Sequence, residues 1–349
     1  MVEPALPYGV PDLDPRVVVH PDDPDRVRCY VRGCQHFLRR PTKYTRGEEC
    51  PDHGIYCHYS RYGATYSYRD VRRNIIASPD LFAQRIVGHP FKYESHRLGA
   101  ENSEDALSWN VFRSLQEAGS LATVAKLMTG EDHPQEPDLY LWGIRVSDDS
   151  FEPWDLLIAA RERFESNLPV KRPLTEPDIA LHLPGKYLVL IEAKFTSSNP
   201  FYERGPRKDA QSLTLDELLR IYRDDSLRIL DYAKARSADR IYYQLWRNMV
   251  FAEWMAGREA HSTRAYHVNL VRENYDVDSC LEFARSLNIH FAGRFQRRSW
   301  ESFWHLYETD RTRSTELYPY LQGKTARLMQ ALDLNVSNVH GGLVTFFPC

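Results

Sequence analysis

The stretch from Glu176 to Lys194 constrains the fold of this chain most strongly, because it combines an apolar hairpin with acidic and basic residues at defined positions. Its second half, residues 187–195, is apolar on both faces until the charges begin, which predicts a buried central strand. Pro184 and Gly185 supply the turn. The sequence therefore predicts a β-hairpin whose second strand lies inside a sheet.

The charged residues of this hairpin are expected to meet on one face. Residues two apart along a strand share a face, so Glu192 and Lys194 continue the row of the preceding leucines. In a hairpin symmetric about Gly185, Asp178 lies opposite Glu192, with Cβ atoms roughly 5 Å apart. Like charges at that distance repel, and burial of an unpaired charge is costly. A divalent cation between the two carboxylates, with Lys194 beside it, removes both objections and predicts a metal site.

Pro177-Asp178 followed by Glu192-Ala193-Lys194 resembles the signature of the PD-(D/E)xK nuclease superfamily, the restriction-endonuclease-like fold. The resemblance covers roughly residues 95–275 and implies an α/β domain with an αβββαβ core and added helices. Glu136-Pro137-Asp138 repeats the first half of the signature, but no Glu-x-Lys on an apolar strand follows it at hairpin distance. The alternative is a partly exposed hairpin whose Glu and Lys face solvent, which the apolar run before Glu192 disfavours.

The resemblance implies a phosphodiesterase that uses Mg²⁺ or Mn²⁺ and acts on nucleic acid, with DNA favoured. Asp178 and Glu192 would hold the ion through oxygen atoms, which such hard cations prefer, and the carbonyl of Ala193 would add a ligand. Lys194 would position or activate the attacking water, or stabilise the transition state. Whether the site binds one or two metal ions remains open.

A third metal ligand is expected from a helix that precedes the hairpin. The helix is predicted to begin at Asn102 or Ser103 and to end at Gly119. Glu104 lies on its apolar side, which is an unusual place for an acid. In the resembled superfamily a glutamate of the first core helix often joins the metal site, so Glu104 is the first candidate and Glu101 the second. The helix dipole alone would also favour both acids at this end.

Four of the six cysteines fall within residues 29–57, where two short pairs of potential metal ligands are separated by 15 residues. Such spacing suits tetrahedral Zn²⁺, which binds thiolate and imidazole groups. The expected ligands are Cys29, Cys34, Cys50 and His53, and Cys57 or His58 is able to replace one of them. Four protein ligands leave no open coordination position, which predicts a structural site. The module resembles a zinc ribbon; unrelated buried thiols are the alternative.

The length of 349 residues predicts a main domain with a smaller module. We expect a zinc-ribbon-like module with an irregular lead-in at residues 1–65 and a nuclease-like domain at residues 66–349. No run approaches about 18 apolar residues, and the N-terminus lacks the pattern of a signal peptide, so we expect a cytoplasmic protein without a membrane span. The net charge of −3 gives no global signature of nucleic-acid binding, which leaves the contact to a local basic surface.

The hydrophobic pattern predicts further elements outside the hairpin. Strands are expected at residues 139–146 and 264–272. Helices are expected at residues 153–165, 214–235 and 239–257. A linker or edge strand is expected at Tyr66–Asp70, after an irregular segment at residues 1–26. A last helix is expected to pack the aromatic residues Phe295, Trp300, Phe303, Trp304 and Tyr307 inward.

Contacts with the substrate backbone are expected from a polar loop and from a helix. The loop residues are Arg204, Arg207 and Lys208, and the helix residues are Gln244 and Arg247. By analogy, the combination of zinc module and nuclease predicts an enzyme of bacterial defence or DNA processing, with a homodimer as one arrangement for a double-strand cut. The alternative is a catalytically inactive module that binds nucleic acid or protein on the same fold.

Overall fold

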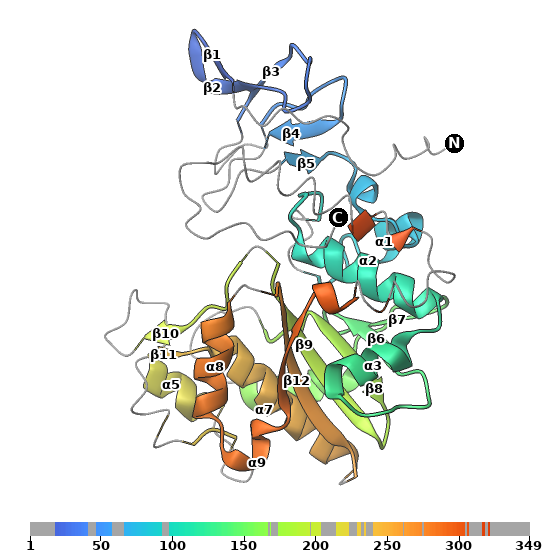
Figure 1. The fold of residues 1–349 in the computed structure, drawn as a ribbon, viewed down its shortest axis with the longest axis vertical. Helices are drawn as coiled ribbons and strands as arrows, with labels where there is room; N and C mark the ends of the chain where they lie inside the picture. The colour runs from blue at the N-terminus through green and yellow to red at the C-terminus, as the bar shows by residue number, and fades with distance from the viewer. Residues whose placement is uncertain are drawn as a thin grey trace. The chain divides into compact units, whose positions relative to one another are not determined.

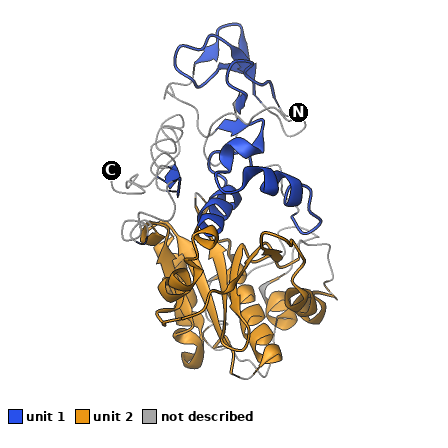
Figure 2. Ribbon diagram, turned by 90° about the vertical axis from the view of Figure 1, so that its right-hand side faces the viewer, with its two compact units in different colours: residues 1–114, 304–349 blue, residues 115–303 orange. Residues whose placement is uncertain are grey.

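The structure is a computed structural model, and it divides the chain into two compact units, residues 1–114 with 304–349 and residues 115–303 (Figure 2). The described residues are 18–40, 47–57, 66–92, 98–166, 168, 174–195, 197–203, 214–222, 229–231, 234, 240–260, 262–273, 276–303, 306, 316–317 and 320–321. The expected boundary between residues 65 and 66 stays a prediction.

A six-stranded mixed sheet forms the centre of residues 115–303 (Figure 1). Its strands are β6 (Asp138–Leu141), β7 (Ile144–Val146), β8 (Ile179–Leu183), β9 (Tyr187–Ala193), β12 (Arg264–Val271) and β13 (Phe295–Ser299). They lie in the order β13-β12-β9-β8-β6-β7. The pairs β9/β12 and β12/β13 are parallel, whereas the remaining pairs are antiparallel. The strand of residues 264–272 is confirmed as β12.

The hairpin β8–β9 has the register that its turn predicts. Ala180 pairs with Leu190, and His182 pairs with Leu188. Gly185 has φ 71°, the left-handed conformation that glycine adopts without strain. Every residue of β9 is buried, which confirms the central strand and shows that the solvent-exposed alternative is wrong.

The single strand expected at residues 139–146 is wrong, because the structure has two strands there, β6 and β7, joined by a tight turn. Trp142 and Gly143 form this turn with φ angles of 55° and 80°. Two successive residues with positive φ fit the twist of a short antiparallel hairpin. A Cβ atom on Gly143 would also lie 2.5 Å from Leu157 Cδ2, so a side chain there would force Leu157 to shift.

Helices pack on the sheet of residues 115–303. The longer ones are α3 (Leu121–Thr129), α4 (Asp155–Glu165), α7 (Tyr243–Glu259) and α8 (Val277–Ser286), and the shorter ones are α5 (Leu215–Ile221) and α9 (Ile289–Ala292). Helix α7 contacts β9 and β12, α4 contacts α7, and α3 contacts β9 and β13. Leu188 and Leu190 of β9 share a core with the apolar stripe of α7. The helices predicted at 153–165 and 239–257 are thus α4 and α7, each shifted by a few residues.

The helix expected at residues 214–235 is wrong as one continuous helix, and residues 223–228 lie outside the described residues. Helix α5 begins with a capping box between Thr214 and Glu217 and ends with Tyr222. Further along, the backbone of Leu230 forms a β-bridge with Leu287, which removes it from any continuous helix. The last predicted helix is also wrong at its start, because Phe295 begins β13.

The aromatic residues after β13 and two short strands ahead of α7 are only partly described. Trp300 and Phe303 are buried as expected, whereas Trp304 and Tyr307 lie outside the described residues. Two short strands, β10 (Tyr202–Glu203) and β11 (Arg240–Ile241), pair ahead of α7.

The unit that contains residues 1–114 is built on small sheets. Strands β1 (Val19–His20), β2 (Asp23–Arg28) and β3 (Phe37–Arg39) form one, and β4 (Ile55–Cys57) and β5 (Tyr66–Tyr68) form another. The irregular lead-in is therefore wrong from residue 19 onward, because antiparallel pairing orders that segment. The edge strand at Tyr66 is confirmed, and residues 1–17 are outside the described chain.

Helical elements follow these strands: η1 (Val71–Asn74), α1 (Pro79–Arg85) and α2 (Glu104–Glu117). The Oγ atom of Ser103 accepts a hydrogen bond from the backbone N–H of Ala106 at 3.1 Å, so Ser103 caps α2 as predicted. Among the described helices, none has the length and apolar character that a bilayer crossing requires.

Candidate active site and metal centre

The predicted acidic residues lie in a polar row that crosses the sheet. The register of β8 and β9, extended by one residue beyond Ile179, places Asp178 opposite Glu192. The parallel pairing continues the row, because Glu192 is the partner of Asn269 in β12 and Asn269 is the partner of Arg297 in β13. Residues paired in register share one face of a sheet. Carboxylates, an amide and a guanidinium therefore follow one another on a single face.

A direct hydrogen bond joins the two halves of the acidic motif. The half-buried carboxylate of Asp178 accepts the backbone N–H of Ala193 through Oδ2 at 2.8 Å. The carbonyl of Asp178 also accepts the N–H of Trp142 at 3.2 Å. Asp178 is thus held by β9 on one side and by the turn between β6 and β7 on the other, and its carboxylate lies beside Ala193, which separates Glu192 from Lys194.

Glu192 and Lys194 form a buried ion pair. Lys194 Nζ lies 2.5 Å from Glu192 Oε1, and the two residues are 7% and 2% exposed. Asn248 of α7, which is fully buried, donates through Nδ2 to Glu192 Oε2 at 2.7 Å. The pairing offsets the cost of removing both charges from water, and the amide fixes the second carboxylate oxygen.

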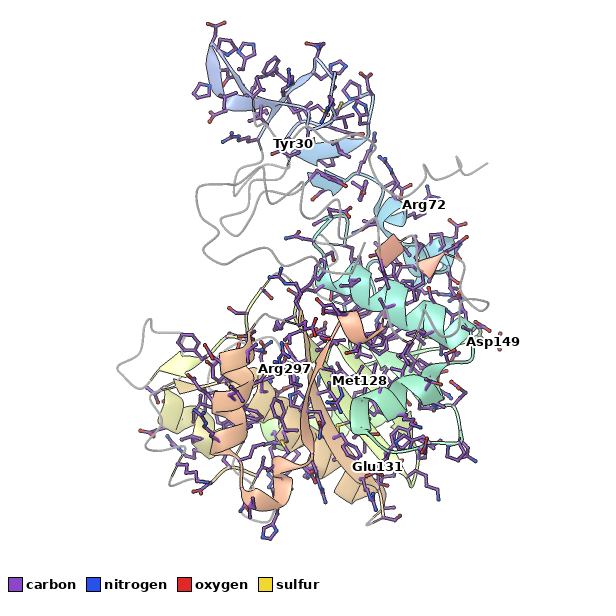
Figure 3. The ribbon with its side chains drawn as sticks, in the orientation of Figure 1. Tyr30, Arg72, Met128, Glu131, Asp149 and Arg297 are labelled. Carbon is purple, nitrogen blue, oxygen red and sulfur yellow. The ribbon has the colours of Figure 1, made fainter. Side chains whose placement is uncertain are left out.

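The sequence alone assigned no role to Asn248, Asn269 or Arg297. Asn248 carried one signal, since it is a polar residue between the buried Leu245 and Met249 on the apolar stripe of α7. Asn269 and Arg297 carried none, because their place in the row depends on parallel pairing between distant strands. Figure 3 labels Arg297, whose guanidinium donates to the carbonyl of Arg272 at 2.9 Å.

Arg247, one of the predicted substrate contacts, lies half-buried on α7 among acidic and phenolic groups. Burial alone would lower the pKa of its guanidinium, but Tyr222, Glu165, Tyr243 and Glu192 raise that pKa overall. Arg247 is therefore positively charged at every pH of interest, and it interacts electrostatically with Glu192. Gln244 is also half-buried, and contact of either residue with nucleic acid stays a prediction.

His267 lies on β12 two residues before Asn269, so the two side chains share one face of the sheet. His267 is fully buried. Its Nδ1 lies 3.1 Å from the carbonyl oxygen of Leu190. Burial lowers the pKa of the imidazole to about 4, so the ring is neutral near pH 7.

We expect the buried His267 to make the protein less stable in acid. The unfolded chain, with an imidazole pKa of about 6.5, binds a proton that the folded chain rejects until about pH 4. The free energy of unfolding should therefore fall by on the order of 3 kcal/mol as the pH drops through this window, and recover above it. Urea titrations between pH 4 and pH 7, on wild type and on His267→Gln, measure the effect. Equal pH dependence in both proteins would contradict it.

The remaining predicted acids fall outside this row. Glu101, in the other unit, is fully buried and accepts a hydrogen bond from Tyr68 Oη at 2.8 Å. Glu104 is the first residue of α2 in that same unit, and its role as a third ligand stays a prediction. Arg204, Arg207 and Lys208 lie outside the described residues.

The repeated half-motif at residues 136–138 has a structural role. Glu136 accepts the backbone N–H groups of Leu121 and Ala122 at 2.8 and 3.3 Å, and therefore caps α3. Asp138 pairs with Arg145 at 2.7 Å. Glu136 and Asp138 therefore both have partners within the fold, and neither partner is Glu192.

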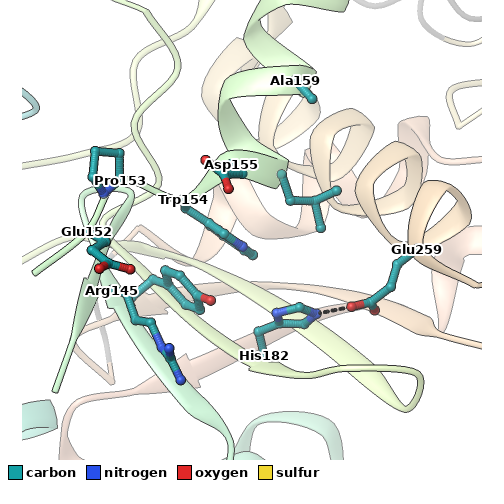
Figure 4. Close-up of a pocket in the computed structure, with 10 residues that line it drawn as sticks. Arg145, Glu152, Pro153, Trp154, Asp155, Ala159, His182 and Glu259 are labelled. Carbon is teal, nitrogen blue, oxygen red and sulfur yellow. Dashed lines mark ion pairs between the residues drawn. The ribbon is translucent and has the colours of Figure 1, made fainter. Parts of the chain in front are cut away.

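A pocket of about 490 Å³ lies near the opposite end of β8 (Figure 4). The stacked rings of Tyr140 and Trp154 line it, together with His182 and Glu259. His182 Nε2 lies 2.9 Å from Glu259 Oε1, which ties β8 to the end of α7. Four residues of strand, about 13 Å, separate His182 from Asp178, so this pocket is distinct from the acidic row.

Cys29, Cys34, Cys50 and His53 lie close together, as their spacing predicts. Their ligand atoms are all within 4.8 Å of one another. Cys50 Sγ lies 3.3 Å from His53 Nδ1 and 3.7 Å from Cys34 Sγ. The side chain of Cys57 and all of His58 fall outside the described residues. The four groups have the composition and proximity to hold a metal ion such as Zn²⁺.

Burial raises the pKa of the Cys29 and Cys50 thiols. Neighbouring cysteines contribute to the increase at Cys29. A bound cation would reverse this effect, since metal ligation favours the thiolate. The proximity of the four ligand atoms, rather than the pKa of the thiols, is what makes this cluster able to hold a metal ion.

Most of the chain matches a known family model. Residues 39–324, most of the chain, match a family model of restriction endonucleases, which defines the protein as restriction-endonuclease-like. The chain belongs to the family described as Restriction Endonuclease associating with ARP. Comparisons with curated proteins and with solved structures gave no match. Nucleic acid is the class of partner that the family implies.

Proposed function

We propose that this protein is a metal-dependent nuclease that hydrolyses phosphodiester bonds, with DNA as its substrate. The observation that carries the proposal is the register that sets Asp178 opposite Glu192, with the ammonium of Lys194 paired to Glu192. Two carboxylates that face each other across a hairpin repel, and a cation bound between them would remove this repulsion.

The oxygen atoms of this site fit Mg²⁺ or Mn²⁺. The carboxylates of Asp178 and Glu192 are hard ligands, and the carbonyl of Ala193 would supply a neutral one. When bound, the cation would lower the pKa of a coordinated water and stabilise the negative charge that develops on the phosphate. Neither thiolate nor imidazole belongs to this donor set, which distinguishes it from the cysteine cluster.

The chain's own residues would orient the reaction. Asn248 fixes one oxygen of Glu192, so the other oxygen and Lys194 have a defined direction. Lys194, released in part from Glu192 by a cation, would hold the attacking water or the phosphate oxygens. Arg247 and Arg297 add positive charge near the same row, which would attract the phosphate backbone.

The wider assignment follows from the same site. The αβββαβ core would comprise α2, β6, β8, β9, α7 and β12, with Glu104 of α2 as a third ligand. The Cys29, Cys34, Cys50 and His53 cluster would hold a structural zinc. We place the enzyme in the cytoplasm, in bacterial defence or DNA processing, with two copies combining for a double-strand cut. The rival function is nucleic-acid or protein binding by an inactive module.

Cleavage assays on plasmid and linear DNA, with RNA as a comparison, test this proposal. We expect nicking with Mg²⁺ or Mn²⁺, none in EDTA, and none by Lys194→Ala, because the variant lacks the ammonium beside the acidic pair. Glu136→Gln, a change in the discarded half-motif, is the matched control and should cleave like wild type. Folded wild-type protein that binds DNA but never cuts it would establish the inactive module instead.

A further inference from the structure

Thr175, three residues before Asp178, is held on several sides by helix α4. The side chain of Glu165 accepts the N–H of Thr175 at 2.9 Å and also accepts its hydroxyl. Arg161 Nε donates to the carbonyl of Thr175 at 2.7 Å. Thr175 is fully buried, so these bonds are shielded from water. The backbone N–H, the backbone carbonyl and the hydroxyl of Thr175 are thus all hydrogen-bonded to side chains of α4.

Glu165 has a third donor and a charged neighbour. Tyr222 donates its hydroxyl to Glu165 Oε1 at 2.8 Å. The charge of Glu165 is among the interactions that raise the pKa of Arg247, as is that of Glu192 in the acidic row. Glu165 is only 4% exposed, and a carboxylate at such depth requires this number of donors.

The chain between Thr175 and Asp178 is short and stiff. Pro177 fixes its own φ and restricts Glu176 to an extended conformation. Thr175 and Asp178 are therefore joined by a link with few conformations, so the position of Thr175 limits where the carboxylate of Asp178 lies. Beyond Asp178 the chain enters β8, which is fixed by its pairing with β9.

We propose that Glu165, with Arg161, is a positioning residue that sets the place of the Asp178 carboxylate by holding Thr175. This inference rests on the proposed function, because it gives α4 a role in the metal affinity of the acidic row. Groups that orient a metal ligand commonly change metal affinity 10- to 100-fold when they are removed, as a rough guide.

Direct Mn²⁺ binding by calorimetry on the full-length, zinc-loaded protein provides the test. Glu165→Gln keeps the side-chain shape but sets an amide group against a donor, so Mn²⁺ should bind about 10-fold more weakly. The Mn²⁺ concentration for half-maximal cleavage should rise by a similar factor, while saturating Mn²⁺ restores most of the rate. A residue needed only for folding would lower the melting temperature without this shift. Glu162→Gln, an exposed acid on the same helix, is the control.

The results of these experiments distinguish the positioning role of Glu165 from the proposed metal site itself. Thr175→Val replaces the hydroxyl with a methyl group and should weaken Mn²⁺ binding several-fold. This variant decides whether the positioning role holds if Glu165→Gln does not fold. Wild-type Mn²⁺ affinity in a folded Glu165→Gln or Thr175→Val protein would overturn the positioning role. Wild-type affinity in Asp178→Asn would instead overturn the proposed metal site.

Discussion

Replacing Glu192 by glutamine is expected to lower metal-dependent cleavage by roughly 10³-fold or more, which corresponds to about 4 kcal/mol of lost transition-state stabilisation. The substitution removes one of the two facing carboxylates, which is also the carboxylate that pairs with the buried Lys194 ammonium. Loss of one member of a buried ion pair costs about 3–5 kcal/mol, so the free energy of unfolding should fall as well. Single-turnover cleavage and urea unfolding measure the two effects.

A double substitution separates catalysis from folding. Glu192→Leu combined with Lys194→Met replaces the pair by apolar groups of similar size, which is often neutral or stabilising in a protein core. We expect this protein to be more stable than Glu192→Gln and equally inactive. Asp178→Asn, which leaves the Glu192–Lys194 pair in place, should also be inactive. A Glu192→Gln protein that keeps more than about a tenth of the wild-type rate would rule out the carboxylate as a ligand.

The parts of the structure that sequence predicted correctly are those fixed by local chemistry. The turn at Pro184 and Gly185 sets the register of β8 and β9, and a period of two then assigns Glu192 to the same face as Leu190. Similarly, the spacing of Cys29, Cys34, Cys50 and His53 predicts that their ligand atoms lie close together, and the structure shows that they do. This prediction needs no information about the remaining chain. Each prediction needed only residues close to one another in sequence.

The errors arose where distant contacts or unusual backbone conformations decided the outcome. Trp142 is an apolar residue with positive φ, so its turn is hidden inside what reads as one strand. Leu230 suits a helix by composition, yet pairing with Leu287 overrides that preference. Asn269 and Arg297 enter the acidic row through parallel pairing, whose register no local pattern specifies.

Removing the metal ion from the cysteine cluster is expected to have a second large effect, the unfolding of residues 18–57. These residues have a small core, in which Cys29, Cys34 and Cys50 are themselves buried members. A core of this size rarely holds a fold by itself, and a structural metal commonly supplies the missing stability. We therefore expect about one zinc per chain, and we expect its removal to unfold this segment.

Cys50→Ala tests the zinc prediction most directly, because Cys50 Sγ contacts both Cys34 Sγ and His53 Nδ1. The variant should lose the zinc in elemental analysis and expose residues 18–57 to rapid proteolysis, while the sheet of residues 115–303 stays resistant. Cys280→Ala is the matched control, since Cys280 is also a buried free cysteine but accepts a hydrogen bond from Asn269 instead of joining the cluster. That variant should keep its zinc. Metal-free protein in which residues 18–57 resist protease as well as wild type would show that packing of the thiols, rather than ligation, holds this segment together.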